Sequence, residues 1–132
     1  MTLVDTNILF DLITDDPEWS HWSAQQLERR ASVGALIIND IIYSELSVRF
    51  ANVEDVDGFV SGSDLLHRAM PRGALFLAAK AHSLYRAAGG TRTGVLPDFF
   101  IGAHAAVARL PLLTRDPRRY RTYFPNLALI AP

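Results

Sequence analysis

The sequence contains no cysteine, a single lysine and no long hydrophobic run. The absence of cysteine excludes disulfides, thiol nucleophiles and cysteine-based zinc sites, and it fits a reducing compartment. No apolar run approaches the ~18 residues that a membrane span needs. The N-terminus has acids where a signal peptide has basic residues, so we expect a soluble, cytoplasmic protein with no membrane association.

What the chain does contain is typical of one globular domain. Its 132 residues are 49% hydrophobic and 20% charged, and a net charge of −1 provides no global basic field for nucleic acid. We expect a single domain over residues 1–132. The basic residues are twelve arginines and Lys80, and arginine suits bidentate contacts with phosphate or carboxylate.

Short apolar segments alternate with helical segments along the chain. Four apolar segments are predicted to be buried strands: Thr2–Val4, Ala35–Asn39, Pro111–Thr114 and Leu127–Ile130. Residues 61–71 fit either a short edge strand or a turn of helix. This alternation predicts an α/β fold with a mainly parallel sheet and helices on both faces.

The intervening segments carry helix patterns and helix-start signals. Helices are predicted over residues 6–13, 16–31, 40–50, 53–60, 72–88, 98–110 and 116–124. Asp40 is expected to cap the third of them. In the fifth, one apolar face is expected, consisting of Ala74, Leu77, Ala78, Ala81, Leu84, Tyr85 and Ala88.

Four acids stand where an α/β layout can bring them together. Asp5 and Asp116 follow predicted strands, and Asp98 begins a helix after a loop. Glu45 lies inside a helix, and its apolar neighbours Ile41 and Val48 predict that this face is at least partly buried. In parallel sheets, sites form beyond the carboxyl ends of the strands, so these positions lie at one edge.

Each acid also has a purely structural interpretation. Asp5, Asp98 and Asp116 can be N-caps, each worth ~0.5–2 kcal/mol. Glu45 can pair with Arg49 one helical turn later. The interpretations are compatible, because a capping aspartate can still direct one oxygen to a cation.

If the four acids converge, their mutual repulsion favours a metal ion. Two carboxylates ~5 Å apart repel by roughly 3 kcal/mol at an effective dielectric constant of ~20. A divalent cation removes that repulsion, and an all-oxygen site selects magnesium or manganese over zinc. Such a site can hydrolyse phosphodiesters.

Four stretches in this order resemble the acidic motifs of a known family. They are "LVDTNILFDL", "IIYSEL", "LPDFFIGAHA" and "LLTRD". Together they are similar to the motifs of PIN-domain nucleases, especially the VapC-type toxins of bacterial toxin–antitoxin pairs. The likeness runs from Leu3 to the final "LALIAP".

The resemblance implies a three-layer α/β/α sandwich with a short parallel sheet. It implies an endoribonuclease that requires Mg²⁺ or Mn²⁺ and acts on a structured RNA such as a transfer RNA. It also implies a cognate VapB-type antitoxin that covers the site, and a homodimer.

The resemblance assigns roles to individual residues. The four acids of the motifs match Asp5, Glu45, Asp98 and Asp116. Asp5 and Asp98 are the expected primary metal ligands, Glu45 holds the cation or orients water, and Asp116 completes the pocket. The expected supporting residues are Asn7 and Thr114.

Other residues have both a structural and a functional interpretation. The arginines near Asp116 either form a solvated helix face or contact phosphate beside the site. They are Arg115, Arg118, Arg119 and Arg121. His104 is either a surface or satisfied helix histidine, or a residue that contacts the site. Trp19 and Trp22 suit packing in the core or between subunits, or else base stacking or antitoxin docking.

Two rival hypotheses remain beside a metal-dependent toxin nuclease. One is a catalytically silent PIN-like module that binds RNA or an antitoxin. The other is a different phosphotransfer enzyme or phosphatase. The second is disfavoured because Asn7 breaks an Asp-x-Asp motif and Val95 replaces the lysine of a P-loop after Gly94.

Overall fold

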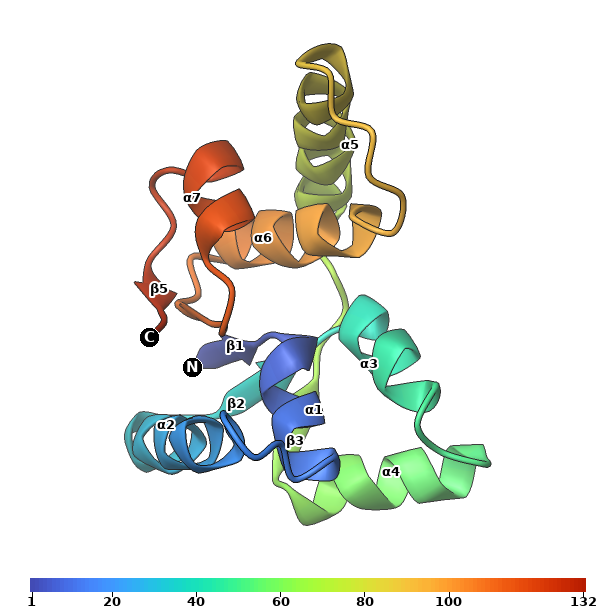
Figure 1. Cartoon of the computed structure of the whole chain (residues 1–132), viewed down its shortest axis with the longest axis vertical. Coiled ribbons are helices and arrows are strands. Elements are labelled where there is room, and N and C mark those ends of the chain that lie inside the picture. The colour runs from blue at the N-terminus through green and yellow to red at the C-terminus, as the bar shows by residue number, and fades with distance from the viewer.

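The computed structural model describes residues 1–132 and contains one sheet of five strands (Figure 1). The strands are β1 (Thr2–Val4), β2 (Leu36–Ile38), β3 (Leu65–His67), β4 (Leu112–Leu113) and β5 (Leu129–Ile130). Their order across the sheet is β3-β2-β1-β4-β5, and every neighbouring pair is parallel. From β1 the chain continues to β2 and β3 on one side, whereas β4 and β5 lie on the other side of β1. The strand order therefore reverses between β1 and β4, and parallel sheets form ligand sites at such a point.

Seven helices connect the strands. They are α1 (Thr6–Ile13), α2 (Ser20–Val33), α3 (Asp40–Ser47), α4 (Val53–Gly62), α5 (Arg72–Ala87), α6 (Leu96–Ala108) and α7 (Arg118–Tyr123). None of them combines the length and the hydrophobicity needed to cross a membrane.

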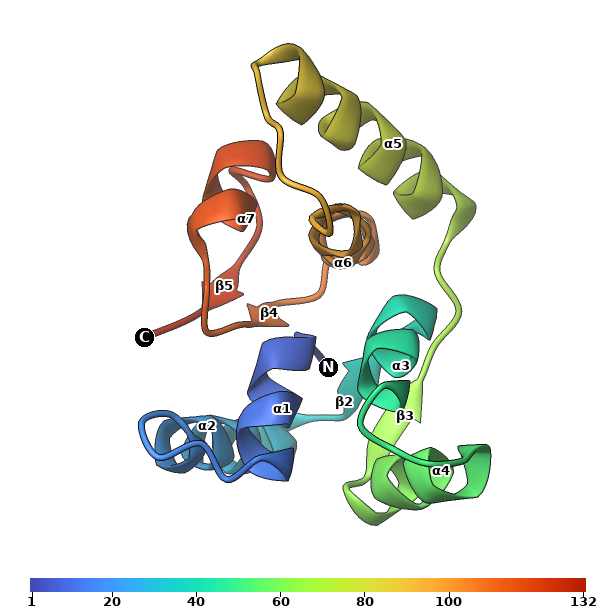
Figure 2. The same ribbon diagram turned by 45° about the vertical axis from the view of Figure 1, so that its right-hand side comes forward.

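The helices cover the sheet on both sides. Figure 2 shows α5, α6 and α7 on one side of the strands and α1, α2 and α4 on the other. A cluster of 23 buried hydrophobic residues, drawn from strands and helices, forms the core. The three-layer α/β/α fold predicted from the sequence is confirmed, and its sheet is parallel throughout.

All four predicted strands are present, and three of them are shorter than predicted. The ambiguous residues 61–71 contain β3, which lies at the edge of the sheet beside β2. Leu66 and His67 of β3 are exposed, so only one residue of this strand is buried. Such a short and partly polar run cannot identify an edge strand from the sequence alone.

The start of α2 and the cap of α3 differ from the prediction, and each difference has a hydrogen-bonding reason. Asp16 accepts the backbone N–H groups of Glu18 and Trp19, both at 2.9 Å, and so closes a turn that delays α2 to Ser20. The cap of α3 is Asn39 and not Asp40, because Asn39 Oδ1 accepts the N–H of Ile42 at 3.0 Å.

The predicted apolar face of α5 is partly correct. Its small residues Ala74, Ala78 and Ala81 are buried, and α5 packs mainly against α6. Leu84 is 65% exposed, so the apolar face narrows toward the end of the helix.

Gly102 allows α6 and α7 to pack closely. A Cβ atom at this position would lie 2.5 Å from Cε2 of Phe124 and 3.0 Å from Cδ1 of Tyr120. Because glycine leaves that space free, the ring of Tyr120 in α7 and the ring of Phe124, which directly follows α7, both lie directly on α6. This contact places Tyr120 at the carboxyl edge of the sheet, where the predicted acids lie.

Candidate functional site

Asp5 and Thr114 meet at the point where the sheet reverses direction. Val4 is paired with Leu113 in the β1–β4 register, and the N–H of Asp5 donates to the carbonyl of Leu113 at 2.9 Å. The residues that directly follow the two strands therefore lie side by side at the carboxyl edge.

The Asp5 carboxylate is buried and held by three donors. Its Oδ2 atom accepts from the hydroxyls of Thr114 and Tyr120, both at 2.8 Å, and from Nδ2 of Asn7 at 3.4 Å. Asp5 occupies the N-cap position of α1, but its side chain makes no capping hydrogen bond. The capping interpretation of the Asp5 carboxylate is therefore wrong.

Burial, followed by the negative charge of Asp98, raises the pKa of Asp5 to about 7. The hydrogen bonds from Thr114 and Tyr120 act in the opposite direction, and the charge of Glu45 adds to the increase. The pKa of the Tyr120 hydroxyl is raised well above its usual value, first by its own burial and then by Asp5, so this hydroxyl remains a proton donor. The protein thus offers Asp5 no positively charged partner that would keep its carboxylate charged near neutral pH.

Glu45 of α3 faces the same edge. The hydroxyl of Thr6 donates to its Oε1 atom at 2.6 Å. The alternative interpretation, a pair with Arg49, is wrong: the Arg49 guanidinium instead lies 5.4 Å from the centre of the Phe10 ring. Burial raises the pKa of Glu45 and the charge of Asp98 raises it further, while the bond from Thr6 lowers it.

Asp98 is held by an arginine from another helix. It is the third residue of α6, whose N-cap is Val95, so the N-cap interpretation is wrong for Asp98. Nη1 of Arg119, in α7, donates to its Oδ2 atom in an ion pair. Burial raises the pKa of Asp98, and Arg119 acts against that increase.

Asp116 is the most exposed of the four acids. Its N–H donates to the Thr114 hydroxyl at 3.2 Å, and its carboxylate receives a 3.3 Å contact from Arg118. It does not cap α7, whose N-cap position is Pro117. Its charge raises the pKa of Asp98, which places the two carboxylates within electrostatic range of each other.

The structure therefore brings Asp5, Glu45 and Asp98 into mutual electrostatic contact, with Asp116 beside Asp98. No three carboxylate or imidazole groups converge closely enough to form a preassembled metal cluster. Each of the three inner acids instead directs one oxygen to a protein donor.

The second oxygen of each inner acid has no protein donor. All three hydrogen bonds to Asp5 end on Oδ2, the bond to Glu45 ends on Oε1, and the bond to Asp98 ends on Oδ2. No buried side-chain oxygen or nitrogen lacks a partner, so the remaining oxygens are accessible. Their all-oxygen chemistry fits a hard divalent cation such as Mg²⁺ or Mn²⁺.

The two expected supporting residues both touch Asp5. Besides contacting Asp5, Nδ2 of Asn7 lies 3.3 Å from the hydroxyl of Thr114. Oδ1 of Asn7 accepts the N–H of Arg115 at 3.1 Å. These bonds connect the start of α1 to the turn that follows β4.

The three candidate substrate-binding arginines have different surroundings. Arg115 is committed to Asp11, with Nε at 3.0 Å from Oδ2 and Nη2 at 2.8 Å from Oδ1. Arg119 is paired with Asp98, and Arg118 extends into solvent. Arg115 therefore anchors the site, whereas Arg118 and Arg119 line its rim.

The sequence interpretation missed three residues that shape the site: Thr6, Asp11 and Tyr120. Tyr120 and Phe124 stand four residues apart in an arginine-rich segment. This spacing places both aromatic side chains on the same face of a helix, which indicates that they point toward the core. Asp11 interrupts the apolar face of α1, a position where a charged residue needs a partner. Thr6 carries no comparable signal, because its role depends on where α3 lies.

His104 is a satisfied core histidine. It is buried in α6, and its Nδ1 atom lies 3.0 Å from Nδ2 of Asn39. Because Oδ1 of Asn39 accepts a backbone N–H, Nδ2 is the donor to the ring. Burial lowers the pKa of His104, so the ring stays neutral and takes no part in the acid cluster.

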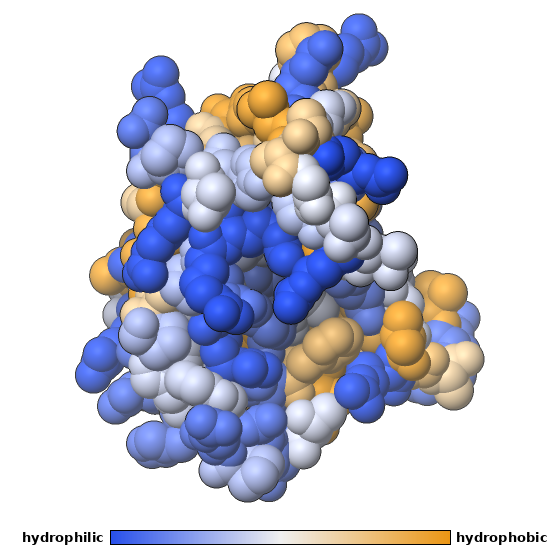
Figure 3. Space-filling model, turned by 45° about the horizontal axis from the view of Figure 1, so that its top comes forward, coloured by the Kyte–Doolittle hydropathy of each residue, from blue (hydrophilic) through white to orange (hydrophobic).

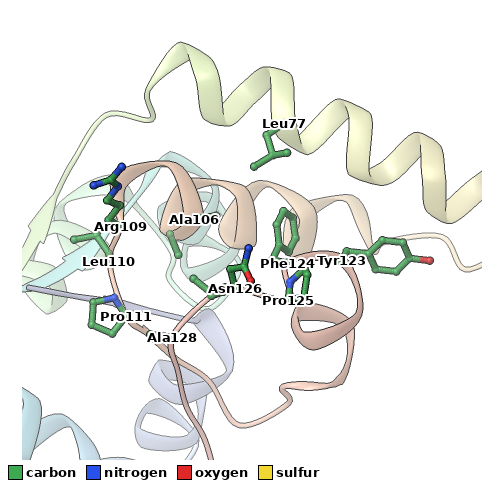
Figure 4. Close-up of a pocket in the computed structure, with 12 residues that line it drawn as sticks. Leu77, Ala106, Arg109, Leu110, Pro111, Tyr123, Phe124, Pro125, Asn126 and Ala128 are labelled. Carbon is green, nitrogen blue, oxygen red and sulfur yellow. The ribbon is translucent and has the colours of Figure 1, made fainter.

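An apolar cavity lies at the other end of the sheet. Its volume is about 400 Å³, and it lies between α5, α6 and the segment that leads from α7 to β5 (Figure 4). Leu110 and Pro111 precede β4 and Ala128 precedes β5, so this cavity is at the amino edge. It is separate from the acids.

A family model of the PIN domain matches residues 2–125, and the chain belongs to the PIN domain family. No curated protein matches the sequence.

Among solved structures, the chain is similar to VapBC2 from Rickettsia felis bound to a DNA fragment from their promoter. The TM-score is 0.74 at 21% sequence identity, over 99% of this chain and 98% of that chain. A toxin–antitoxin complex from Klebsiella pneumoniae has a TM-score of 0.67 at 25% identity, over 91% and 90% of the two chains. VapBC-1 from nontypeable Haemophilus influenzae has a TM-score of 0.73 at 17% identity, over 98% and 96%. The resemblance to PIN domains is thus confirmed in family, and the similarity to the VapBC structures is confirmed in fold.

Proposed function

We propose that this PIN domain is a metal-dependent endoribonuclease and the toxin of a type II toxin–antitoxin pair. The observation that carries the proposal is the arrangement of Asp5, Glu45 and Asp98. Each presents one fixed and one donor-free carboxylate oxygen at the same edge of the sheet. A domain that only binds RNA gains nothing from raising the pKa of Asp5 to about 7 beside two other acids.

The donor-free oxygens are the groups that would hold Mg²⁺ or Mn²⁺. Asp5 and Asp98 would be the main ligands, and Glu45 and Asp116 would complete the shell or orient water. A cation bound there supplies activation of a water molecule and stabilisation of the leaving oxygen of a phosphodiester. Thr114 and Tyr120 fix the Asp5 carboxylate by donating to its other oxygen.

The proposal extends to the partners of the protein. The similar structures include VapBC complexes and a toxin–antitoxin complex, which supports a VapB-type antitoxin that covers the acids. The substrate is RNA with defined structure, such as a transfer RNA, and the protein forms a homodimer.

A silent binding module is the second candidate. The ion pair between Arg119 and Asp98, and the lack of a preassembled three-ligand cluster, favour this alternative. The two candidates differ in metal-dependent turnover.

An RNA cleavage assay separates them. The wild type should cleave total RNA with Mg²⁺ or Mn²⁺ and stop in EDTA, and Asp98→Asn should be inactive. Glu28→Gln removes an acid from the exposed face of α2 and should cleave as the wild type does. Cleavage that persists in EDTA or in Asp98→Asn rules out the carboxylate–metal mechanism. A wild type that binds RNA without cutting it favours the binding module.

A further inference from the structure

A second hollow adjoins the acids and is lined by arginine. Its volume is about 390 Å³, and its walls include Tyr85, Arg92, Asp116, Arg118, Arg119 and Thr122. Since Asp116 belongs to this hollow and Arg119 contacts Asp98, the hollow lies next to the acids. Figure 3 shows hydrophilic side chains gathered around a hollow on the face that it presents. We call these six residues the arginine hollow.

Tyr85 connects the parts of the arginine hollow. Its hydroxyl accepts the N–H of Arg92 at 3.0 Å, which holds the α5–α6 connection against α5. A Cβ atom at Gly90 would lie 2.4 Å from Cζ of Tyr85, so this connection crosses the ring closely. The Arg119 guanidinium lies 5.9 Å from the centre of the same ring. One side chain thus contacts both the backbone of Arg92 and the guanidinium of Arg119.

The positive charge in the arginine hollow is not fully compensated. Arg92 forms no ion pair, and Arg118 has only a 3.3 Å contact with the exposed Asp116. Arg119 shares its charge with Asp98. By contrast, Arg115 is held by Asp11 on the other side of the β4–α7 turn and does not reach the hollow.

We propose that the arginine hollow binds a phosphate group of the RNA, next to the phosphodiester that is cut. The inference rests on the proposed function and identifies where the RNA is bound beside the acids. Guanidinium groups bind phosphate oxygens in bidentate fashion, and contacts of this kind position a strand without reading its sequence. The phosphate is either internal to the strand or a terminal monophosphate.

RNA binding without cleavage tests the proposal. A fluorescent single-stranded RNA is titrated in EDTA at several salt concentrations, with either a 5′-hydroxyl or a 5′-phosphate. The double variant Arg92→Gln/Arg118→Gln removes two phosphate contacts. We expect about tenfold weaker binding and a salt dependence whose slope falls by ~1.4, at ~0.7 per contact for single strands.

A control for the loss of a surface arginine comes from the opposite face of the sheet. Arg29 is exposed on α2, away from α5 and α7, and Arg29→Gln should retain the wild-type slope (Figure 2). Tyr85→Phe leaves the charge unchanged but removes the hydroxyl that holds Arg92, and we expect binding about threefold weaker. Wild-type binding by Tyr85→Phe contradicts a built pocket.

The outcomes separate this proposal from the proposed function. A loss of affinity with both RNAs assigns an internal phosphate, and a loss confined to the 5′-phosphorylated RNA assigns a terminal one. A double variant that behaves like Arg29→Gln overturns the phosphate site, even if the wild type cleaves RNA with Mg²⁺. Arginine-dependent binding by a protein that never cleaves retains the phosphate site and rejects the nuclease.

Discussion

At the scale of single residues, the site depends on which oxygen of each acid is occupied. Asp5 is 4% exposed, and all of its donors reach the same carboxylate oxygen. Hydrogen bonds to a carboxylate favour its charged form, yet here burial and Asp98 outweigh them. The Asp5 carboxylate is therefore held in one orientation, and a bound cation would stabilise its charged form.

The raised pKa of Asp5 predicts an unusual dependence of stability on pH. Asp5 has a pKa of about 7 in the folded chain, against an ordinary value of 3.8 in an unfolded chain, so the folded state binds more protons between these values. The free energy of unfolding should therefore decrease as the pH rises from about 4 to 7, by at most about 4 kcal/mol at 1.36 kcal/mol per pKa unit.

Urea unfolding in EDTA at about pH 4.5 and pH 8 measures this decrease. Asp5→Asn cannot titrate, so the decrease should be clearly smaller in that variant. Equal pH dependence in the two proteins would show that Asp5 is not the titrating group.

At the scale of elements, a buried ion pair fixes the turn between β4 and α7. The side chain of Asp11, in α1, is 2% exposed and that of Arg115 is 31% exposed. Ser23 of α2 also donates to Asp11 at 2.7 Å, and the Arg115 guanidinium lies 5.5 Å from the centre of the Trp19 ring. Three separate segments therefore meet at one carboxylate.

Breaking this pair should be costly. Arg115→Ala leaves the buried Asp11 charge without its cation, so the free energy of unfolding should fall by about 3 kcal/mol. Arg118→Ala breaks an exposed pair and should lower it by less than ~1 kcal/mol. Urea titrations of both variants measure the contrast. Similar losses in the two variants would mean that the Asp11–Arg115 pair does not anchor the turn.

The sequence predicted the elements well and their ends less well. The strands were predictable because runs such as Leu36–Ile38 are apolar without alternation, as in strands buried on both faces. Helix starts failed where a polar side chain had two possible uses. Asp16 closes a turn, Asn39 caps a helix, and Asp98 pairs with Arg119, and each outcome depends on neighbours that are distant in sequence or on local turn geometry.

At the scale of the whole molecule, the strand order collects residues from across the chain. Placing β1 between β2 and β4 puts Asp5 beside Thr114, 109 positions away. Asp5 and Asp116 follow strands and Glu45 lies on a helix that follows one, so these positions indicated a shared edge, whereas Asp98 lies on a helix that follows another helix and was predicted from the order of the four motifs. Asn7 and Thr114 were predicted beside Asp5, but the bonds from Thr6, Tyr120 and Arg119 were not, because these side chains face the acids only after both helical layers have packed on the sheet.

The central claim is that the Asp5 carboxylate serves cleavage and not the stability of the fold. Asparagine at this position retains an oxygen that can accept from Thr114 and Tyr120, and it removes a charge that is costly to bury. Asp5→Asn should therefore unfold at the same or a higher urea concentration than the wild type.

The most direct test measures RNA cleavage and urea unfolding on the same preparation of Asp5→Asn. We predict a loss of cleavage greater than ~100-fold, which exceeds the ~10–100-fold cost of losing a supporting residue, in a protein whose free energy of unfolding in EDTA is unchanged or increased. Wild-type cleavage by a folded Asp5→Asn protein, or a variant that fails to fold, would contradict the account.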